Sequence, residues 1–165
     1  MKIRLEHKNI GAALMQIAEH DQFTAINSMK VNGEKINNAF KINHNIGIFC
    51  KYASEPNSLG EYLFTFTSDH IKDIREIATQ SEKTFIVLAC IEDGEICNLE
   101  YSNFEKLIEN RRKFAGTNED SYQILVTAEL GKSLKAYVNA AGKKGTIAGK
   151  GITIARKSFP DQLFE

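Results

Sequence analysis

Hydrophobic positions recur along this chain with two different periods, and the two periods predict helices and strands. Apolar residues at helical spacing indicate three helices, over residues 9–18, 68–78 and 102–113. Alternating apolar residues, and short runs rich in aromatic and β-branched side chains, indicate strands between and after these helices. The predicted strands are 23–31, 40–52, 62–67, 85–91, 96–99, 122–130, 134–140 and 152–156.

Two dipeptides predict where strands fold back on each other. Asn32-Gly33 is preferred in tight hairpin turns because both central positions need a positive φ angle. We expect Asp93-Gly94 to act in the same way. A loop centred on Asp93-Gly94 places Cys90 directly opposite Cys97.

The longest alternating segment, 40–52, is either one long strand or two strands broken near Asn45 or Gly47. Its alternation places His44 on the apolar face, where a histidine is more often a hydrogen-bonded core residue than a catalytic base. Capping residues predict the helix starts. The expected caps are Asn9 for the first helix, Ser68 or Asp69 for the second, and a capping box of Ser102 and Glu105 for the third.

The order of these elements predicts a single α+β domain over residues 1–165, with a mixed, mostly antiparallel β-sheet and about three helices. Residues 85–91 are apolar at every position, which is typical of a central strand covered on both faces. No stretch resembles a linker between two domains.

Composition narrows the class of protein. The chain has 42% hydrophobic and 25% charged residues, with 21 basic and 21 acidic side chains, which is typical of a globular domain and not of a disordered one. No apolar run reaches the length of a membrane span, and the first residues lack the apolar core of a signal peptide. We therefore expect a cytoplasmic protein with no membrane partner.

The cysteines and histidines indicate neither a disulfide framework nor a metal site. The chain has three cysteines, Cys50, Cys90 and Cys97, and no CxxC motif. Because an odd number cannot all be paired in disulfides, we expect buried, reduced thiols. The four histidines form no zinc-ligand cluster with them. The sequence therefore predicts no metal and no cofactor.

Positive charge is concentrated near the end of the chain. The glycine-rich segment 131–160 has seven basic residues and no acid, whereas residues 1–130 have an acidic excess. Such a density of positive charge favours a polyanionic partner, although lysines on strands and turns also protect sheet edges from pairing. The candidate nucleic-acid-binding residues are Lys132, Lys135, Lys143, Lys144, Lys150, Arg156 and Lys157.

The sequence offers little for catalysis. It has no phosphate-binding glycine motif and no serine in a nucleophile context. Glu55, Glu61, Asp69 and His70 come from one loop-and-helix region and are the first candidates for a metal-dependent enzyme, but no spacing among them fixes a site. A solvated acidic rim is the simpler interpretation.

Residues 46–108 resemble the core of the restriction-endonuclease-like nucleases in the order of their elements. In that family two or three antiparallel strands lead into a helix, which is followed by a hydrophobic strand and a further helix. The segments 46–52, 62–67, 69–78, 85–91 and 104–108 follow a similar order. The resemblance covers about 60 of the 165 residues.

The family's catalytic signature is absent from these segments. That signature is an aspartate on one strand and a carboxylate-x-lysine on the next, which together hold a divalent metal. Residues 63–67 contain neither an acid nor a lysine, and Phe49 stands two residues before Lys51, where the carboxylate belongs. The resemblance therefore implies a catalytically degenerate core, with no active-site residue carried over.

Three hypotheses for function follow. The first is a non-enzymatic nucleic-acid-associated domain that binds the phosphates of DNA or RNA through segment 131–160. The second is a protein-binding or inhibitory module, of the kind found in mobile elements, with no catalytic activity. The third is an enzyme, which the sequence disfavours without excluding.

Overall fold

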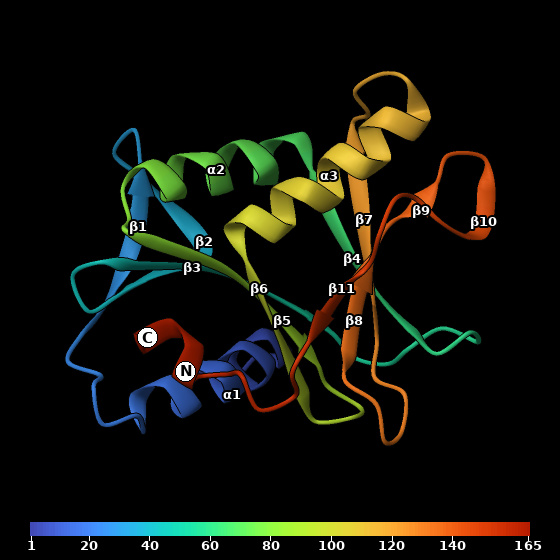
Figure 1. Cartoon of the computed structure of the whole chain (residues 1–165). Helices are drawn as coiled ribbons and strands as arrows, with labels where there is room; N and C mark the ends of the chain where they lie inside the picture. Colours follow the sequence, from blue (N-terminus) through green and yellow to red (C-terminus); the bar gives the residue numbers. More distant parts are fainter.

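Two β-sheets and three α-helices form the chain, which is described by a computed structural model (Figure 1). The structure describes the backbone of residues 1–165 and the side chains of all of them except Lys143 and Lys144. The helices are α1 (Leu5–Ala18), α2 (Ser68–Thr79) and α3 (Tyr101–Ala115), followed near the end by a short 3-10 helix, η1 (Asp161–Phe164).

The larger sheet, sheet A, has five strands in the order β1-β2-β3-β5-β6. Strands β3 and β5 run parallel, and the other neighbours in sheet A are antiparallel. The strands are β1 (Ile26–Val31), β2 (Glu34–Ile42), β3 (Ile46–Ala53), β5 (Lys83–Cys90) and β6 (Glu95–Glu100).

The smaller sheet, sheet B, is antiparallel throughout, with the order β11-β8-β7-β4, and a separate hairpin lies beside it. The chain is therefore an α+β protein with mixed, mostly antiparallel sheets, as the sequence predicted. The sheet B strands are β4 (Glu61–Thr67), β7 (Ser121–Thr127), β8 (Leu134–Tyr137) and β11 (Ile152–Ile154), and the hairpin consists of β9 (Asn139–Ala140) and β10 (Lys143–Ile147).

Sheet A separates two hydrophobic cores. On one face, α1 and the segment that contains η1 cover the sheet, and on the other face α2, α3 and sheet B do so (Figure 1). The central strand β5 supplies both cores, with Ile86 and Leu88 on one side and Phe85 and Val87 on the other. The prediction of a central strand covered on both faces is confirmed.

The Asn32-Gly33 hairpin is also confirmed, with φ angles of 52° and 79° at its two central residues. The long segment 40–52 is two strands, separated by a turn in which Asn43 has a φ angle of 54°. His44 lies exposed in this turn, so its expected place on an apolar face is wrong. The turn interrupts the alternation on which that expectation depended.

All three predicted helix caps are wrong. Helix α1 begins four residues before Asn9, which is buried inside it. Helix α2 is capped by the last residue of β4, Thr67, whose Oγ1 accepts a hydrogen bond from the backbone N–H of His70 at 3.2 Å. Helix α3 follows β6 directly at Tyr101 without a side-chain cap, because the strand feeds straight into the helix.

The predicted register of the β5–β6 hairpin is wrong by two residues. Cys90 lies opposite Glu95, and Cys97 lies opposite Leu88, because the chain turns through four loop residues, 91–94. The predicted burial of the cysteines is confirmed, since Cys50, Cys90 and Cys97 are all buried free thiols. No helix in the described part of the chain is long and apolar enough to cross a membrane.

The buried thiols predict slow chemical labelling. Burial raises the pKa of Cys50 and Cys90 to about 12, and it also raises the pKa of Cys97, so almost no reactive thiolate forms at neutral pH. We expect a disulfide reagent to label none of the three rapidly in the native protein and all three after unfolding. Rapid labelling of one thiol under native conditions would contradict the described core.

Candidate functional site

The segment 131–160 forms strands β8 and β11 of sheet B and the β9–β10 hairpin, and its basic residues whose side chains are described are spread over several of these elements and loops. Lys135 lies on β8, Lys132 in the loop before it, Lys150 in the loop before β11, and Arg156 and Lys157 after β11. The remaining two predicted residues, Lys143 and Lys144, belong to β10, and their side chains lie outside the described residues.

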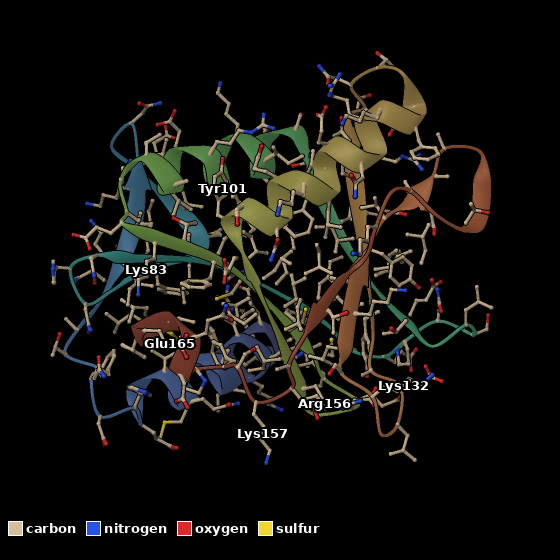
Figure 2. The ribbon with its side chains drawn as sticks, viewed as in Figure 1. Lys83, Tyr101, Lys132, Arg156, Lys157 and Glu165 are labelled. Carbon is tan, nitrogen blue, oxygen red and sulfur yellow. The ribbon has the colours of Figure 1, made fainter. Side chains whose placement is uncertain are left out.

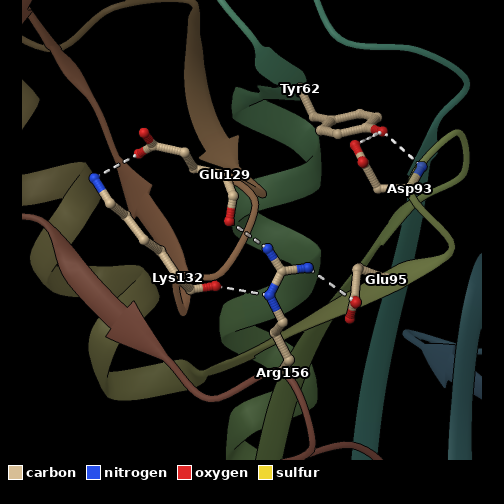
Figure 3. Close-up of polar contacts among 6 residues, drawn as sticks. All are labelled: Tyr62, Asp93, Glu95, Glu129, Lys132 and Arg156. Atoms are coloured by element: carbon tan, nitrogen blue, oxygen red, sulfur yellow. Dashed lines mark hydrogen bonds and ion pairs between the residues drawn. The ribbon is translucent and has the colours of Figure 1, made fainter.

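The guanidinium of Arg156 is held by contacts with other residues of the chain (Figure 3). Its Nη1 pairs with Glu95 Oε1 at 2.9 Å, while Nε and Nη2 each donate to a backbone carbonyl, of Lys132 and of Glu129, at 2.7 Å. The side chain therefore joins β6 of sheet A to the loop between β7 and β8. Lys132 Nζ forms an ion pair with Glu129 Oε2 at 3.1 Å, and both side chains are exposed.

Three of the predicted residues, Lys135, Lys150 and Lys157, are exposed and form no ion pair within the described part of the chain. The Nζ atom of Lys135 lies 5.9 Å from the centroid of the Tyr137 ring. Lys157 points away from the ribbon, next to Arg156, which points inward (Figure 2). These three ammonium groups are available to a polyanion.

A second candidate site is a cavity of about 590 Å³ between β2 and β3 of sheet A, β4 of sheet B and the first half of α2. Cavities of this size with a few convergent polar groups are typical of small-molecule sites. Strands β2, β3 and β4 and helix α2 line it. Its polar and aromatic lining includes Asn38, Phe49, Lys51, Thr65, His70 and Asp73.

Lys51 is one of the charged residues that line this cavity, with Glu6, Glu34, Lys35 and Asp73. Its side chain is half-buried, and its Nζ atom lies 5.3 Å from the centroid of the Phe66 ring. Burial lowers the pKa of the Lys51 ammonium, and no acid among the described side chains forms an ion pair with it. The lining as a whole is not cationic, because three carboxylates accompany its two lysines.

His70 is held in place beside Lys51. The backbone N–H of Thr67 donates to His70 Nδ1 at 3.2 Å, so the neutral imidazole carries its proton on Nε2. The His70 ring also lies 5.7 Å, centroid to centroid, from the Phe49 ring. Burial and then the charge of Lys51 lower the pKa of His70, and these effects outweigh the opposite influence of Asp73 and Asp69.

The suspected carboxylates do not join His70 in one cluster. Glu61 is 8% exposed and is occupied by hydrogen bonds from the Tyr137 hydroxyl and from Asn57 Nδ2. Glu55 and Asp69 are exposed, in a loop and in the first turn of α2. No group of three His, Cys, Asp or Glu side chains close enough to hold a metal ion occurs among the described residues.

Sequence reasoning missed this cavity as a site. The sequence contained one usable signal for the cavity, which is Lys51 within the apolar segment 46–52. This lysine was considered from the sequence only because it lacks the carboxylate partner of a nuclease. The cavity depends on the chain passing from β3 of sheet A to β4 of sheet B, which no local pattern encodes.

Replacing Lys51 is expected to change the titration of His70. In the Lys51→Met variant the imidazolium no longer faces a nearby positive charge, so the pKa of His70 should rise. An NMR titration of the His70 ring protons measures this. Lys72→Met, at an exposed lysine of α2, is the matched control and should leave the pKa of His70 unchanged. An unchanged His70 pKa in Lys51→Met would contradict the described cavity.

Replacing Arg156 is expected to destabilise the fold. Arg156→Ala removes three hydrogen bonds, one of them to a carboxylate, and should lower the free energy of unfolding by about 2 kcal/mol. Lys157→Ala, at the exposed neighbouring position, should change it by less than about 0.5 kcal/mol. Urea unfolding measures both, and equal effects would show that Arg156 does not join the two sheets.

Comparisons of this chain with protein-family models, with curated proteins and with solved structures found no match. Its function is therefore inferred from its own residues and their geometry.

Proposed function

We propose that the chain is a non-enzymatic domain that binds DNA or RNA by contacting phosphates through segment 131–160. One observation carries the proposal. In a segment with seven basic residues and no acid, Lys135, Lys150 and Lys157 are exposed and unpaired among the described side chains. Such lysines neutralise phosphates and release condensed counterions, which is the main source of sequence-independent affinity for nucleic acid.

The geometry of the segment supports weak binding without sequence readout. Tyr137, the one aromatic residue among its basic residues, is 7% exposed, and its hydroxyl donates to Glu61, so its ring offers no stacking surface for a base. Gly142 lies in a turn with a φ angle of 73°, and Gly145 lies in β10, where the pairing with β9 is irregular, with a φ angle of 79°. Backbone geometry therefore accounts for both glycines without a close approach to nucleic acid.

A degenerate restriction-endonuclease-like core is part of the same proposal. Strand β3, helix α2, strand β5 and helix α3 follow one another in the order of that family, but β4 between them belongs to sheet B. The strand beside β3 is therefore β2, where Asn37 and Asn38 precede Ala39, the residue opposite Phe49. No carboxylate stands at these positions or at Phe49, so Lys51 lacks the acidic partners of a metal-dependent nuclease.

A second candidate function, a protein-binding module, is favoured by two exposed leucines. Leu59 is 71% exposed and Leu130 is 96% exposed. Their loops lie at the same end of sheet B, because Glu61 pairs with Thr127 immediately beside both loops. Exposed apolar side chains on neighbouring loops favour contact with a protein partner over contact with nucleic acid.

The charge of the lysines provides the test. We expect the triple variant Lys135→Ala, Lys150→Ala and Lys157→Ala to weaken binding to a DNA duplex, measured by fluorescence anisotropy at several salt concentrations. The slope of log affinity against log salt concentration should fall by roughly one for each phosphate that the variant no longer neutralises.

The control is the double variant Lys72→Ala and Lys106→Ala, at exposed lysines of α2 and α3 outside the segment. It should bind as the unchanged protein does. Absence of binding at low salt, or equal weakening in the control, would refute the proposal. The protein-binding module would instead be supported by a stoichiometric protein partner that stays bound after nuclease treatment. That partner should not bind the Leu130→Ser variant.

A further inference from the structure

Strand β4 forms one edge of sheet B, next to β7 (Figure 1). Its pairing with β7 is regular over all seven residues, and it has no charged residue after Glu61. Edge strands are usually protected from further pairing by charges, irregular register or short length. The other three edges of the two sheets have such protection. Strand β1 has a register shift beside Lys30, β6 begins and ends with a glutamate, and β11 has three residues.

The contacts of Ser68, directly after β4, show which way the backbone groups of the strand point. The Ser68 N–H donates to the Asp120 C=O at 3.0 Å, which continues the ladder between β4 and β7 by one pair. Successive residues of an antiparallel strand bond alternately to one side and to the other. The even-numbered residues of β4 therefore bond to β7. The N–H and C=O groups of the odd-numbered residues, including Leu63 and Thr65, point to the free edge.

Local contacts occupy both ends of this free edge but leave its middle open. The Glu61 C=O accepts a hydrogen bond from the Asn57 N–H at 2.8 Å. The Thr67 N–H donates to His70 Nδ1 at 3.2 Å. Within the described residues, no backbone or side-chain group pairs with the outward N–H and C=O groups of the two odd-numbered residues in between. These groups are therefore available to a further strand.

The open part of the edge borders the cavity of about 590 Å³, because Leu63 and Thr65 both line it. Both residues are exposed, and Leu63 is 46% exposed. A strand that pairs with β4 would lie about 4.7–4.9 Å from it, in the space that the cavity provides. Residues of β2, β3 and α2 form the other walls of this space.

We propose that this cavity binds an extended peptide segment of a partner protein, which pairs with β4 as a fifth strand of sheet B. The peptide backbone exchanges hydrogen bonds with Leu63 and Thr65, as in other cases of strand addition to a sheet edge. A second copy of this chain fits less well, because its own β4 has the same walls beside it. The site is independent of the proposed contact with nucleic acid, since no basic residue of segment 131–160 lines the cavity.

The side chains around the edge specify the pattern of the peptide. Phe64 is 2% exposed, so the peptide residue opposite it points inward, toward Phe49 and Lys51 of the lining. An aliphatic side chain suits this position. The two flanking peptide residues lie beside Leu63 and Thr65 on the exposed face, where β-branched side chains pair well. Because three carboxylates and two lysines line the cavity, basic ends are favoured over acidic ones.

The probe is the synthetic peptide acetyl-Lys-Val-Thr-Val-Thr-Val-Lys-amide. When its central valine lies opposite Phe64, its two threonines lie opposite Leu63 and Thr65. We expect saturable shifts of the Leu63 and Thr65 backbone amide signals in ¹⁵N NMR spectra, with a dissociation constant in the millimolar range or below. Hydrogen exchange of these two amides should become slower when the peptide is bound.

Two methylated peptides provide a matched control. Methylation of one threonine backbone nitrogen removes an N–H that donates to β4 and should weaken binding about tenfold or more. Methylation of the central valine nitrogen, which points away from β4, should weaken it far less. In the protein, Thr65→Pro removes an N–H of the free edge without removing a bond to β7, and it should weaken binding as the methylated threonine does. Thr65→Val keeps this N–H and should bind as the unchanged protein does.

Three outcomes would overturn the proposal. The first is no saturable shift up to about 5 mM peptide. The second is equal weakening by the two methylated peptides, a comparison that leaves the protein unchanged and so holds even if Thr65→Pro does not fold. The third is a dimer in analytical ultracentrifugation that Thr65→Pro abolishes and Thr65→Val does not, which would assign the edge to a second copy of the chain.

Discussion

The parallel pairing of β3 with β5 is the constraint on which the other parts of the structure depend. Two parallel neighbours cannot be joined by a tight turn, so the chain must leave the sheet and return to the opposite end. Here the crossover consists of β4 and α2. Strand β4 moves into sheet B, α2 covers sheet A, and the space at their divergence is the cavity that contains Lys51 and His70. Thus one topological requirement creates both the second sheet and the larger cavity.

Local patterns in the sequence were sufficient for the class of fold and for the central strand. The apolar run at 85–91 indicated burial on both faces, and Asn32-Gly33 indicated a tight turn, because both signals arise within a few adjacent residues. The helix caps and the register of Cys90 failed for two different reasons. Thr67 is both the last residue of β4 and the cap of α2, so the strand pattern concealed the cap. The β5–β6 loop is contacted by Tyr62, whose hydroxyl donates to Asp93 from 31 residues away, and local sequence does not encode that contact.

The candidate site shows the same limit. Charge counting identified segment 131–160, but it could not distinguish Arg156 from Lys157, since the two are adjacent and both basic. The structure distinguishes them, because the Arg156 guanidinium donates hydrogen bonds to Glu95 and to two backbone carbonyls, whereas the side chain of Lys157 is exposed to solvent.

The place of β4 in sheet B also has a consequence for how the chain folds during synthesis. Its only strand neighbour is β7, and Glu61 pairs with Thr127, so β4 emerges long before its partner exists. Sheet A and the helices α1, α2 and α3 that cover it lie within the first 115 residues and can assemble earlier. Until β7 is made, Tyr62, Phe64 and Phe66 lack much of their native cover, and an unpaired apolar strand of this kind is prone to aggregation. The last third of the chain thus protects a strand that was completed well before it.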